Sequence, residues 1–189
     1  ARECAQKSAT EGASAMLGAV IVAQGDKASL TGLQRPIAAL TEECERILIV
    51  GEMESPALRI TGAEHRSLPR GASELSGLTA ALRLADGDHV AIVSAGIERP
   101  SAELLRYMCR VRGSFEAVIP ERDDGTVQPL LGLYHCALLR RAEGLLAAGE
   151  GRIGALLELA SVRRITPEEV AKFGDPDRLL GTAGPHSVM

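Results

Sequence analysis

The chain has 189 residues, which is enough for one domain with a substantial buried core, and its 46% hydrophobic content excludes a disordered or fibrous protein. Its formal charge of -4, from 25 acidic and 21 basic residues, leaves no broad basic surface for nucleic acid. Aromatic residues make up only 2% of the chain, which argues against a stacking platform for bases. The carboxylates leave metal binding open until their positions are known.

Hydropathy and cysteine spacing predict a cytoplasmic protein with no membrane span. The longest apolar run, about residues 17–23, is much shorter than the roughly 20 residues that a bilayer requires. We expect residues 1–15, which are small and polar, to be a flexible extension before a single domain over 16–189. The four cysteines are scattered with no C-x-x-C pair, which indicates reduced thiols, and Cys44 and Cys109 fit small core positions in helices.

In the first half of the chain, short apolar runs alternate with helical patterns. Continuous apolar runs are typical of buried strands, and apolar residues three or four positions apart are typical of helices. The predicted strands are residues 17–23, 46–51, 58–61 and 88–94. The predicted helices are residues 33–44, 73–86 and 101–111, with Ser101 as the cap of the last one.

In the second half, Asp123, Asp124 and Gly125 separate two extended runs, which is a hairpin signal. The later elements are helices at about 137–148 and 152–160, a strand at 161–166, a capped helix from Thr166 and an irregular tail at 174–189. Together the patterns predict one α/β domain, a three-layer sandwich whose mostly parallel sheet has an antiparallel portion. Such sheets bind ligands beyond the carboxyl ends of their strands, which here are residues 25–27, 51–54 and 94–98.

Several short patterns occur in a fixed order from about Leu17 to the C-terminus. They are AQG followed by Asp26 and Lys27, GASELSGL at 71–78, QPL at 128–130 with Tyr134, and LAAGE at 146–150. In order and spacing they resemble the molybdenum cofactor guanylyltransferases (MobA-like proteins), whose patterns are L-A-G-G-x-S-x-R-M-G-x-D-K, P-G-x-G-P-L-x-G-L, Q-P-L…Y and L-x-x-G-E. The resemblance implies the nucleotide-diphosphosugar-transferase fold, which is Rossmann-like.

The resemblance also implies transfer of GMP from GTP to molybdopterin, with Mg²⁺ on the phosphates. In such a reaction the acceptor attacks the α-phosphorus of GTP and pyrophosphate leaves, so negative charge on the phosphates must be neutralised. Lys27 is the candidate catalytic residue, because its ammonium group can meet a phosphate. The residues expected to bind the nucleotide are Gly25, Asp26, Lys27, Gly71, Ser76, Gly77 and Ser94.

The chain departs from the family at its polar positions. The glycine-rich loop is shortened and keeps only Gly25, and the position implied for the metal carboxylate is Ala95. Near the C-terminus, Gly181 or Ala183 stands in place of an asparagine. We therefore expect a degenerate member with impaired catalysis and no metal ligands, which binds nucleotide, the pterin or a partner protein.

Two alternative functions stay open. An active guanylyltransferase would recruit another carboxylate, such as Glu98 or Asp175, for Mg²⁺. A scaffold would use the fold for protein contact only.

The candidate residues also have plainer interpretations. Lys27 fits a solvated surface position, and Ser76 with Gly77 fits simple helix packing. Asp175 and Asp177 flank a proline, which fits a turn whose side chains bind its own backbone.

The histidines give no metal signal in the sequence. His135 and Cys136 are adjacent, so on a strand they would point to opposite faces of the sheet. His65, His89 and His186 have no partner at ligand spacing. The sequence therefore predicts no metal site at these residues.

Overall fold

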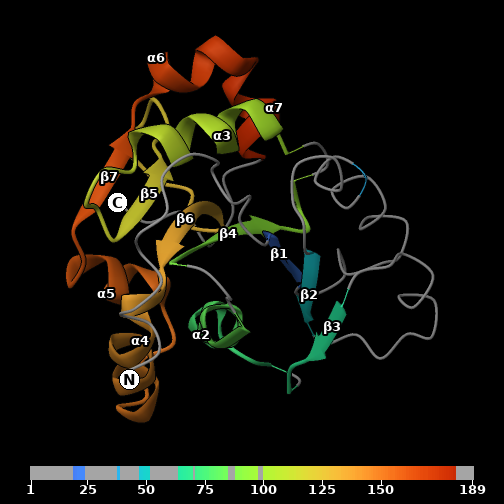
Figure 1. The fold of residues 1–189 in the computed structure, drawn as a ribbon, viewed down its shortest axis with the longest axis vertical. Coiled ribbons are helices and arrows are strands. Elements are labelled where there is room, and N and C mark those ends of the chain that lie inside the picture. The colour runs from blue at the N-terminus through green and yellow to red at the C-terminus, as the bar shows by residue number, and fades with distance from the viewer. Residues whose placement is uncertain are drawn as a thin grey trace, which may run out of the picture.

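One mixed sheet forms the centre of the fold (Figure 1). The structure, a computed structural model, describes residues 19–23, 38, 47–51, 64–69, 71–84, 88–97 and 100–181. Its strands are β1 (Ala19–Ala23), β2 (Ile47–Gly51), β3 (Glu64–Ser67), β4 (His89–Ser94), β5 (Ala117–Pro120), β6 (Leu131–His135) and β7 (Val162–Ile165). Their order across the sheet is β3-β2-β1-β4-β6-β5-β7. The first four of that order run parallel, β6 is antiparallel to both neighbours, and β7 is parallel to β5. The predicted mostly parallel sheet with an antiparallel portion is confirmed.

Helices cover both faces of the sheet. One face carries α2 (Glu74–Leu84), α4 (Leu139–Ala147) and α5 (Ile153–Glu158), and the other carries α3 (Ala102–Val111), α6 (Pro167–Val170) and α7 (Pro176–Leu180) (Figure 1). Two short 3₁₀ helices, η3 (Cys136–Leu138) and η4 (Ala171–Phe173), precede α4 and follow α6. Separate hydrophobic cores lie under the two helix layers, which confirms the three-layer sandwich. None of the described helices is both long and apolar enough to span a bilayer.

Strand β4 shows why the apolar runs are continuous. Val90 and Ile92 pack into the core under α2, α4 and α5, whereas Ala91 and Val93 pack into the core under α3. Successive strand residues point to opposite faces, so a strand that is covered on both sides must be apolar at every position. The sequence run at 88–94 carries that signature.

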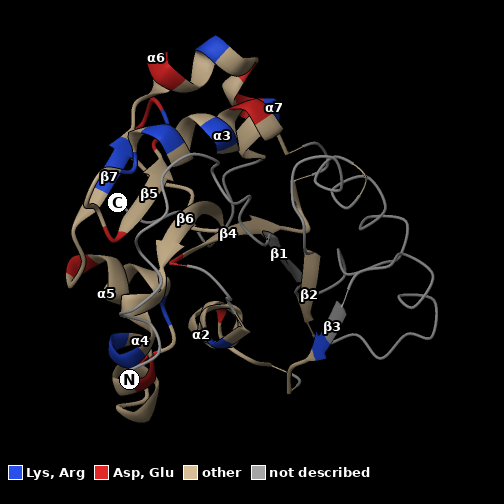
Figure 2. Ribbon diagram, viewed as in Figure 1, with Lys and Arg blue, Asp and Glu red and all other residues tan. Residues whose placement is uncertain are grey.

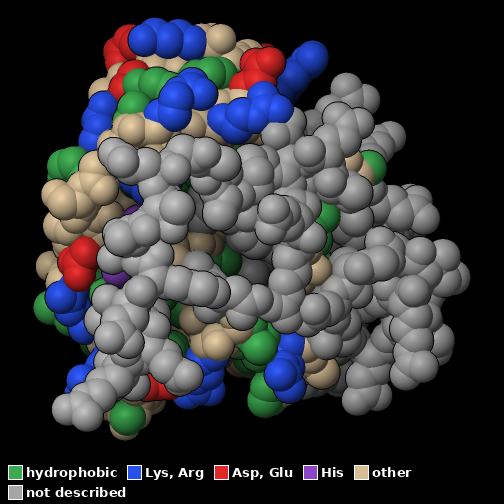
Figure 3. Space-filling model, viewed as in Figure 1, with side chains coloured by type: hydrophobic (Ala, Val, Ile, Leu, Met, Phe, Trp, Pro, Cys, Tyr) green, Lys and Arg blue, Asp and Glu red, His purple; other side chains and the backbone are tan. Residues whose placement is uncertain are grey.

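Charged residues lie outside the middle of the sheet. Strands β2, β4, β5 and β6 contain no Lys, Arg, Asp or Glu, as Figure 2 shows. On the face shown in Figure 3, basic and acidic side chains are interspersed over α3, α6 and α7. The described carboxylates therefore lie mainly on helices, turns and loops, where water solvates them.

Helix α3 begins where the sequence predicts. The Ser101 side chain accepts a hydrogen bond from the backbone N–H of Leu104 at 3.2 Å, and the first turn carries Glu103. This bond satisfies one of the N–H groups that have no partner within the helix. Thr166 caps α6 in the same way, within a complete capping box.

Removing the α3 cap gives a first testable prediction. We expect Ser101→Ala to lower the free energy of unfolding by about 1 kcal/mol, because one N–H of the first turn loses its partner. The control is Ser114→Ala, an exposed loop serine close in sequence to the other end of α3. Urea unfolding followed by circular dichroism measures both, and equal stabilities would contradict the capping role.

Two elements differ from the sequence prediction. The third strand is β3 at Glu64–Ser67, in a stretch that the sequence assigned to a loop, whereas the predicted run at 58–61 lies outside the described residues. β3 lies at the edge of the sheet, where charged residues are tolerated and the apolar signal disappears. Only Ala38 of the helix predicted at 33–44 is described, and it is helical.

The tail is not wholly irregular, because α7 occupies Pro176–Leu180. Asp175 is its N-cap, and the Asp175 carboxylate accepts a hydrogen bond from the N–H of Asp177 at 3.0 Å. The proline between them sits at the start of the helix, where its missing N–H costs nothing. The expected bond from an Asp side chain to its own backbone is therefore present, but it begins a helix, whereas the sequence suggested a turn.

Candidate functional site

The carboxyl ends of the parallel strands meet at one edge of the sheet, which we call the carboxyl edge. Its described residues include Gly51 at the end of β2, Ser67 at the end of β3 and Ser94 at the end of β4. The N–H of Leu68 donates to the carbonyl of Gly51 at 2.8 Å, so the loop that leads into α2 starts against the end of β2. The parallel order therefore brings the end of β4 and the start of α2 to the edge where such folds bind ligands.

A tight turn follows β4 at this edge. The Ser94 side chain accepts a hydrogen bond from the N–H of Gly96 at 3.1 Å, and the N–H of Ile97 donates to the Ser94 carbonyl at 3.0 Å. Ser94 itself is fixed by its own N–H, which donates to the carbonyl of Leu130 at 2.6 Å. The predicted site residue Ser94 is thus at the carboxyl edge, and its hydroxyl shapes the turn that contains Ala95.

The end of α7 lies against this turn. A Cβ built on Gly181 would lie 3.6 Å from Cγ1 of Ile97 and 3.7 Å from the carbonyl oxygen of Gly96. Ala95 is only 5% exposed, and it shares a hydrophobic core with Ile97 and Leu180. The fold therefore brings Gly181, one of the two positions at which the resemblance implies an amide, next to the turn that contains Ala95, where it implies a carboxylate.

The side chains at positions 95 and 181 decide whether this part of the edge can bind Mg²⁺. In proteins the ion is usually held by one or two carboxylates together with phosphate oxygens. Ala95 and Gly181 have no side-chain oxygen that could bind the ion, so these two positions do not fit the Mg²⁺ that the resemblance implies. Asp175 caps the opposite end of α7 from Gly181, while Glu98 and Ala183 lie outside the described residues.

Two buried polar side chains that sequence reasoning missed hold the end of α7 in place. Arg122 and Gln128 come from the two arms of the β5–β6 hairpin and are 9% and 7% exposed. Nη2 of Arg122 donates to the carbonyls of Leu180 at 3.1 Å and Gly181 at 2.9 Å, and Nε2 of Gln128 donates to the Leu180 carbonyl at 2.9 Å. Three hydrogen bonds therefore tie a hairpin to a segment more than fifty residues away in the chain.

The same two side chains keep one polar atom each without a partner. Nε of Arg122 and Oε1 of Gln128 are buried and accept or donate no hydrogen bond among the described residues. The QPL pattern marked Gln128 as part of a family segment but gave no partner for it. Arg122 carried no sequence signal beyond its place in the hairpin.

The start of α2 favours the packing interpretation of two predicted site residues. The Ser73 hydroxyl accepts from the N–H of Ser76 at 3.2 Å and lies 2.9 Å from the Ser76 hydroxyl. Gly77 is buried, and the N–H of Leu75 donates to the carbonyl of Gly151 at 3.1 Å. The Ser76 hydroxyl is thus already engaged in the cap of its own helix.

The remaining predicted site residues divide into two groups. Gly71 lies in the exposed loop before α2 with φ +75°, a conformation that favours glycine. Gly25, Asp26 and Lys27 lie outside the described residues, so the structure does not place the phosphate-facing part of the predicted site.

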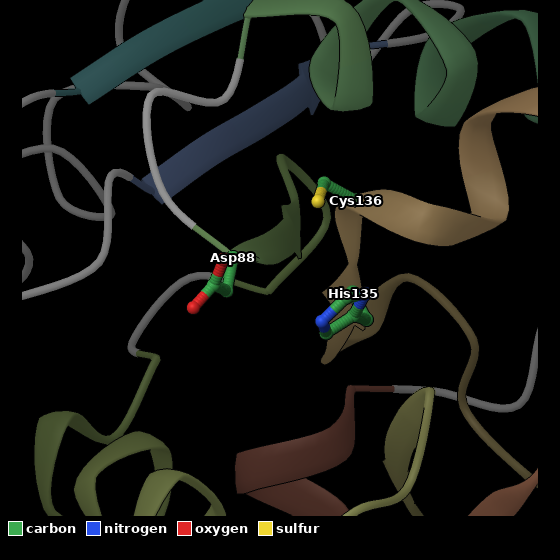
Figure 4. Close-up of side chains that lie close together, drawn as sticks. All are labelled: Asp88, His135 and Cys136. Atoms are coloured by element: carbon green, nitrogen blue, oxygen red, sulfur yellow. The ribbon is translucent and has the colours of Figure 1, made fainter. Parts of the chain in front are cut away.

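At the opposite edge of the sheet, the structure corrects the expectation that the side chains of His135 and Cys136 face apart. Ligand atoms of Asp88, His135 and Cys136 all lie within 4.8 Å of one another (Figure 4). Strand alternation does not hold here, because β6 ends at His135 and Cys136 begins η3. His89 also has a neighbour, since its ring packs edge-on against His135 with 4.7 Å between centroids.

His89 is neutral in this environment. Burial, the neighbouring His135 and the positive charge of Arg112 lower its pKa from 6.5 to about 4. Its Nε2 is buried with no hydrogen-bond partner among the described residues. The ring therefore acts as a packed, uncharged group at the start of β4.

Comparison with known proteins agrees with this architecture. Residues 22–165 match the family model described as the MobA-like NTP transferase domain. A relative from Deinococcus radiodurans with the name "Probable molybdenum cofactor guanylyltransferase" is 37% identical in an alignment of 138 residues, and the match covers 68% of this chain and 68% of that one.

Solved structures share the fold at lower identity. Molybdopterin-guanine dinucleotide biosynthesis protein A from Archaeoglobus fulgidus has a TM-score of 0.65 at 19% identity, over 87% of this chain and 90% of that one. The 2-C-methyl-D-erythritol 4-phosphate cytidylyltransferase from Thermus thermophilus has a TM-score of 0.61 at 18% identity, over 88% and 92%. At these identities the likeness supports the nucleotidyltransferase fold.

Proposed function

This chain belongs to the MobA-like NTP transferase family, and from that premise we propose that it is a guanylyltransferase-like protein of molybdopterin guanine dinucleotide biosynthesis with impaired catalysis. It binds a nucleotide of the GTP class, the pterin or a partner protein without efficient transfer of GMP. It acts in the cytoplasm as a single domain over residues 16–189. The observation that carries the proposal is that Ala95, buried in a hydrophobic core at the end of β4, occupies the position at which the resemblance implies the metal carboxylate.

The chemistry explains why that position matters. Transfer of a nucleotidyl group develops negative charge on the phosphates, and fixed positive charge or Mg²⁺ must stabilise it. Loss of one carboxylate can be compensated by a neighbour, but here the glycine-rich loop is also shortened and Gly181 or Ala183 replaces the amide, and several losses are harder to compensate. Lys27 remains as a positive charge that can contact a phosphate in the proposed site, together with Gly25 and Asp26.

The names of the relatives support the choice of ligand. A guanylyltransferase of the molybdenum cofactor is the named activity of the Deinococcus relative, and molybdopterin guanine dinucleotide biosynthesis is that of the Archaeoglobus structure. We therefore take GTP and molybdopterin as the first ligands to test. The relative at 37% identity also favours a second candidate, an active guanylyltransferase that recruits Glu98 as the carboxylate for Mg²⁺.

Thermal shift with GTP and Mg²⁺, combined with a transfer assay, tests the proposal. At a ligand concentration near 100 Kd, binding stabilises the folded state by about 2.7 kcal/mol, which is a rise in Tm of several degrees. We expect GTP to raise the Tm of the wild-type chain and Lys27→Ala to remove that rise. Lys172→Ala, an exposed lysine at η4, is the matched control and should keep it.

The assay distinguishes impaired from full catalysis. We expect little product from GTP and molybdopterin with the wild-type chain, and a gain of Mg²⁺-dependent product with Ala95→Asp. Ala95→Asn has the same shape without the charge and should show no gain. Efficient wild-type turnover would contradict impaired catalysis and favour recruitment of Glu98. The absence of stabilisation by any nucleotide or by the pterin would leave a scaffold for protein contact.

A further inference from the structure

We propose that Asp88, His135 and Cys136 form a binding site for a thiophilic divalent cation of the Zn²⁺ class. The three residues lie at the amino end of β4 and the carboxyl end of β6, which is the edge of the sheet opposite the carboxyl edge (Figure 4). The site is therefore independent of the proposed nucleotide site. Its three donors are a carboxylate, an imidazole and a thiol, each contributing one ligand atom.

The backbone fixes two of the ligands across an antiparallel pair. His89 of β4 is opposite His135 of β6 in the register of the sheet, so Asp88 lies directly across from Cys136. The N–H of Cys136 donates to the carbonyl of Asp88 at 2.7 Å and continues the ladder by one residue. The Asp88 and Cys136 backbones are thus held together by the strands, before any metal binds.

The change from strand to 3₁₀ helix brings the third ligand to the same side. In a strand, His135 and Cys136 would be related by a half turn and would face apart. Cys136 instead begins η3, in which successive residues rotate by about 120°. Where the strand gives way to η3, the imidazole and the thiol lie within 4.8 Å of each other and of the Asp88 carboxylate.

The spacing suits a site that closes on a metal. Zn–S bonds of about 2.3 Å and Zn–N or Zn–O bonds of about 2.0–2.2 Å put tetrahedral ligand atoms roughly 3.3–3.7 Å apart. The side chains must therefore approach by about 1 Å from the spacing of up to 4.8 Å. Asp88 is exposed and the other two residues are half-buried, so side-chain rotation can supply that movement and the cation can enter from solvent.

The donor set selects the class of cation. A thiolate together with an imidazole favours Zn²⁺ and similar borderline metals over Mg²⁺ or Ca²⁺, which prefer all-oxygen sites. On binding, the Cys136 thiol loses its proton to solvent and the sulfur becomes a thiolate ligand. Three protein ligands leave one tetrahedral position for water.

One hydrogen bond of the metal-free site bears on the His135 imidazole. Its Nδ1 accepts from the N–H of Ala137 at 3.0 Å and caps η3. Metal binding at Nδ1 displaces that bond, and metal binding at Nε2 moves the ring proton to Nδ1, so in either case the ring no longer accepts from Ala137. His135→Asn keeps an acceptor for Ala137 and removes the imidazole, so it separates the metal role from the cap.

Titration of the chelator-treated full chain with Co²⁺, which reports thiolate ligation by an absorption band in the near ultraviolet, tests the proposal. We expect the wild-type chain to bind one Co²⁺ with this band, to release a proton, and to give up the Co²⁺ to Zn²⁺. Cys136→Ser should lose the band, and Cys109→Ser, which alters a partly buried thiol on α3, should keep it. We expect His135→Asn and Asp88→Asn to weaken binding by at least about tenfold.

A second measurement does not depend on the absorption band. Zn²⁺ should raise the Tm of the wild-type chain and of Cys109→Ser, and should leave that of Cys136→Ser unchanged. The proposal is overturned if the wild-type chain shows no thiolate band, or if Cys136→Ser keeps the band and the Zn²⁺-dependent rise in Tm. Unchanged affinity in Asp88→Asn or His135→Asn would overturn the three-ligand set.

Discussion

Arg122→Met is expected to lower the free energy of unfolding by about 2 kcal/mol, because hydrogen bonds from a charged group to buried carbonyls are among the stronger ones. The substitution leaves the Gly181 carbonyl without the donor seen in the structure and leaves the Leu180 carbonyl with Gln128 alone. Removal of a buried charge whose Nε has no partner among the described residues offsets part of the loss. The effect should therefore be smaller than the sum of two such bonds.

The matched control for this prediction is Arg178→Met. Arg178 is an arginine on α7 itself, but its side chain is 88% exposed and lies 3.7 Å from Asp175. Exposed ion pairs of this kind contribute little, so its stability should match that of the wild-type chain. Urea unfolding measures both variants. Hydrogen exchange at Leu179, whose N–H donates to Asp175 within α7, should become faster in Arg122→Met only. Unchanged stability together with unchanged protection at Leu179 would show that Arg122 does not hold the end of α7 in place.

Gly132→Ala is expected to lower the free energy of unfolding by about 2–3 kcal/mol through overpacking. A Cβ at Gly132 would lie 2.9 Å from the carbonyl oxygen of Val118 and 3.3 Å from side-chain atoms of Ile119 and Tyr134. The oxygen belongs to the neighbouring strand β5, so relief requires the β5–β6 pairing to shift.

Gly144→Ala provides the contrast, because the same chemical change is made where space is open. Gly144 lies within α4, and a Cβ there would meet nothing within 4 Å. Alanine is favoured over glycine in a helix by about 0.5–1 kcal/mol, so this variant should be more stable than the wild-type chain. Thermal unfolding of the two variants should move in opposite directions. Equal shifts would mean that the close approach at Gly132 does not determine stability.

The fold was largely predictable because burial on two faces leaves a simple pattern. The run at β4 is apolar at every central position, and the Asp-Asp-Gly segment at 123–125 matches the observed hairpin, in which Gly125 has φ +81°. β3 was not predictable in the same way, since an edge strand needs no apolar face. Neither was α7, whose helix start at Asp175 is coded by only a few residues.

Of the candidate site, only the residues that follow β4 could be located from the sequence and compared with the described structure. Ser94 and Ala95 could be assigned to the carboxyl edge from strand order alone. The hydrogen bonds that hold the end of α7 could not be found from sequence. Arg122 and Gln128 donate to carbonyls more than fifty residues away, and backbone acceptors leave no sequence signal. The expectation that the side chains of His135 and Cys136 face apart was wrong because it assumed that the strand continues through Cys136, whereas a 3₁₀ turn begins there.

The backbone at Gly181 limits which side chains this position can carry. Gly181 has φ +69° and ψ 175°, a combination that is essentially confined to glycine. An asparagine placed there would be strained by this backbone conformation, although its Cβ would make only ordinary contact with Ile97 at 3.6 Å. Ala95→Asp, in contrast, adds a side chain to an unstrained position. The two positions are therefore unequal in what they can accept: residue 95 can gain a carboxylate by a single exchange, whereas residue 181 can carry a side chain without strain only if the chain at residues 180–181 takes a different path.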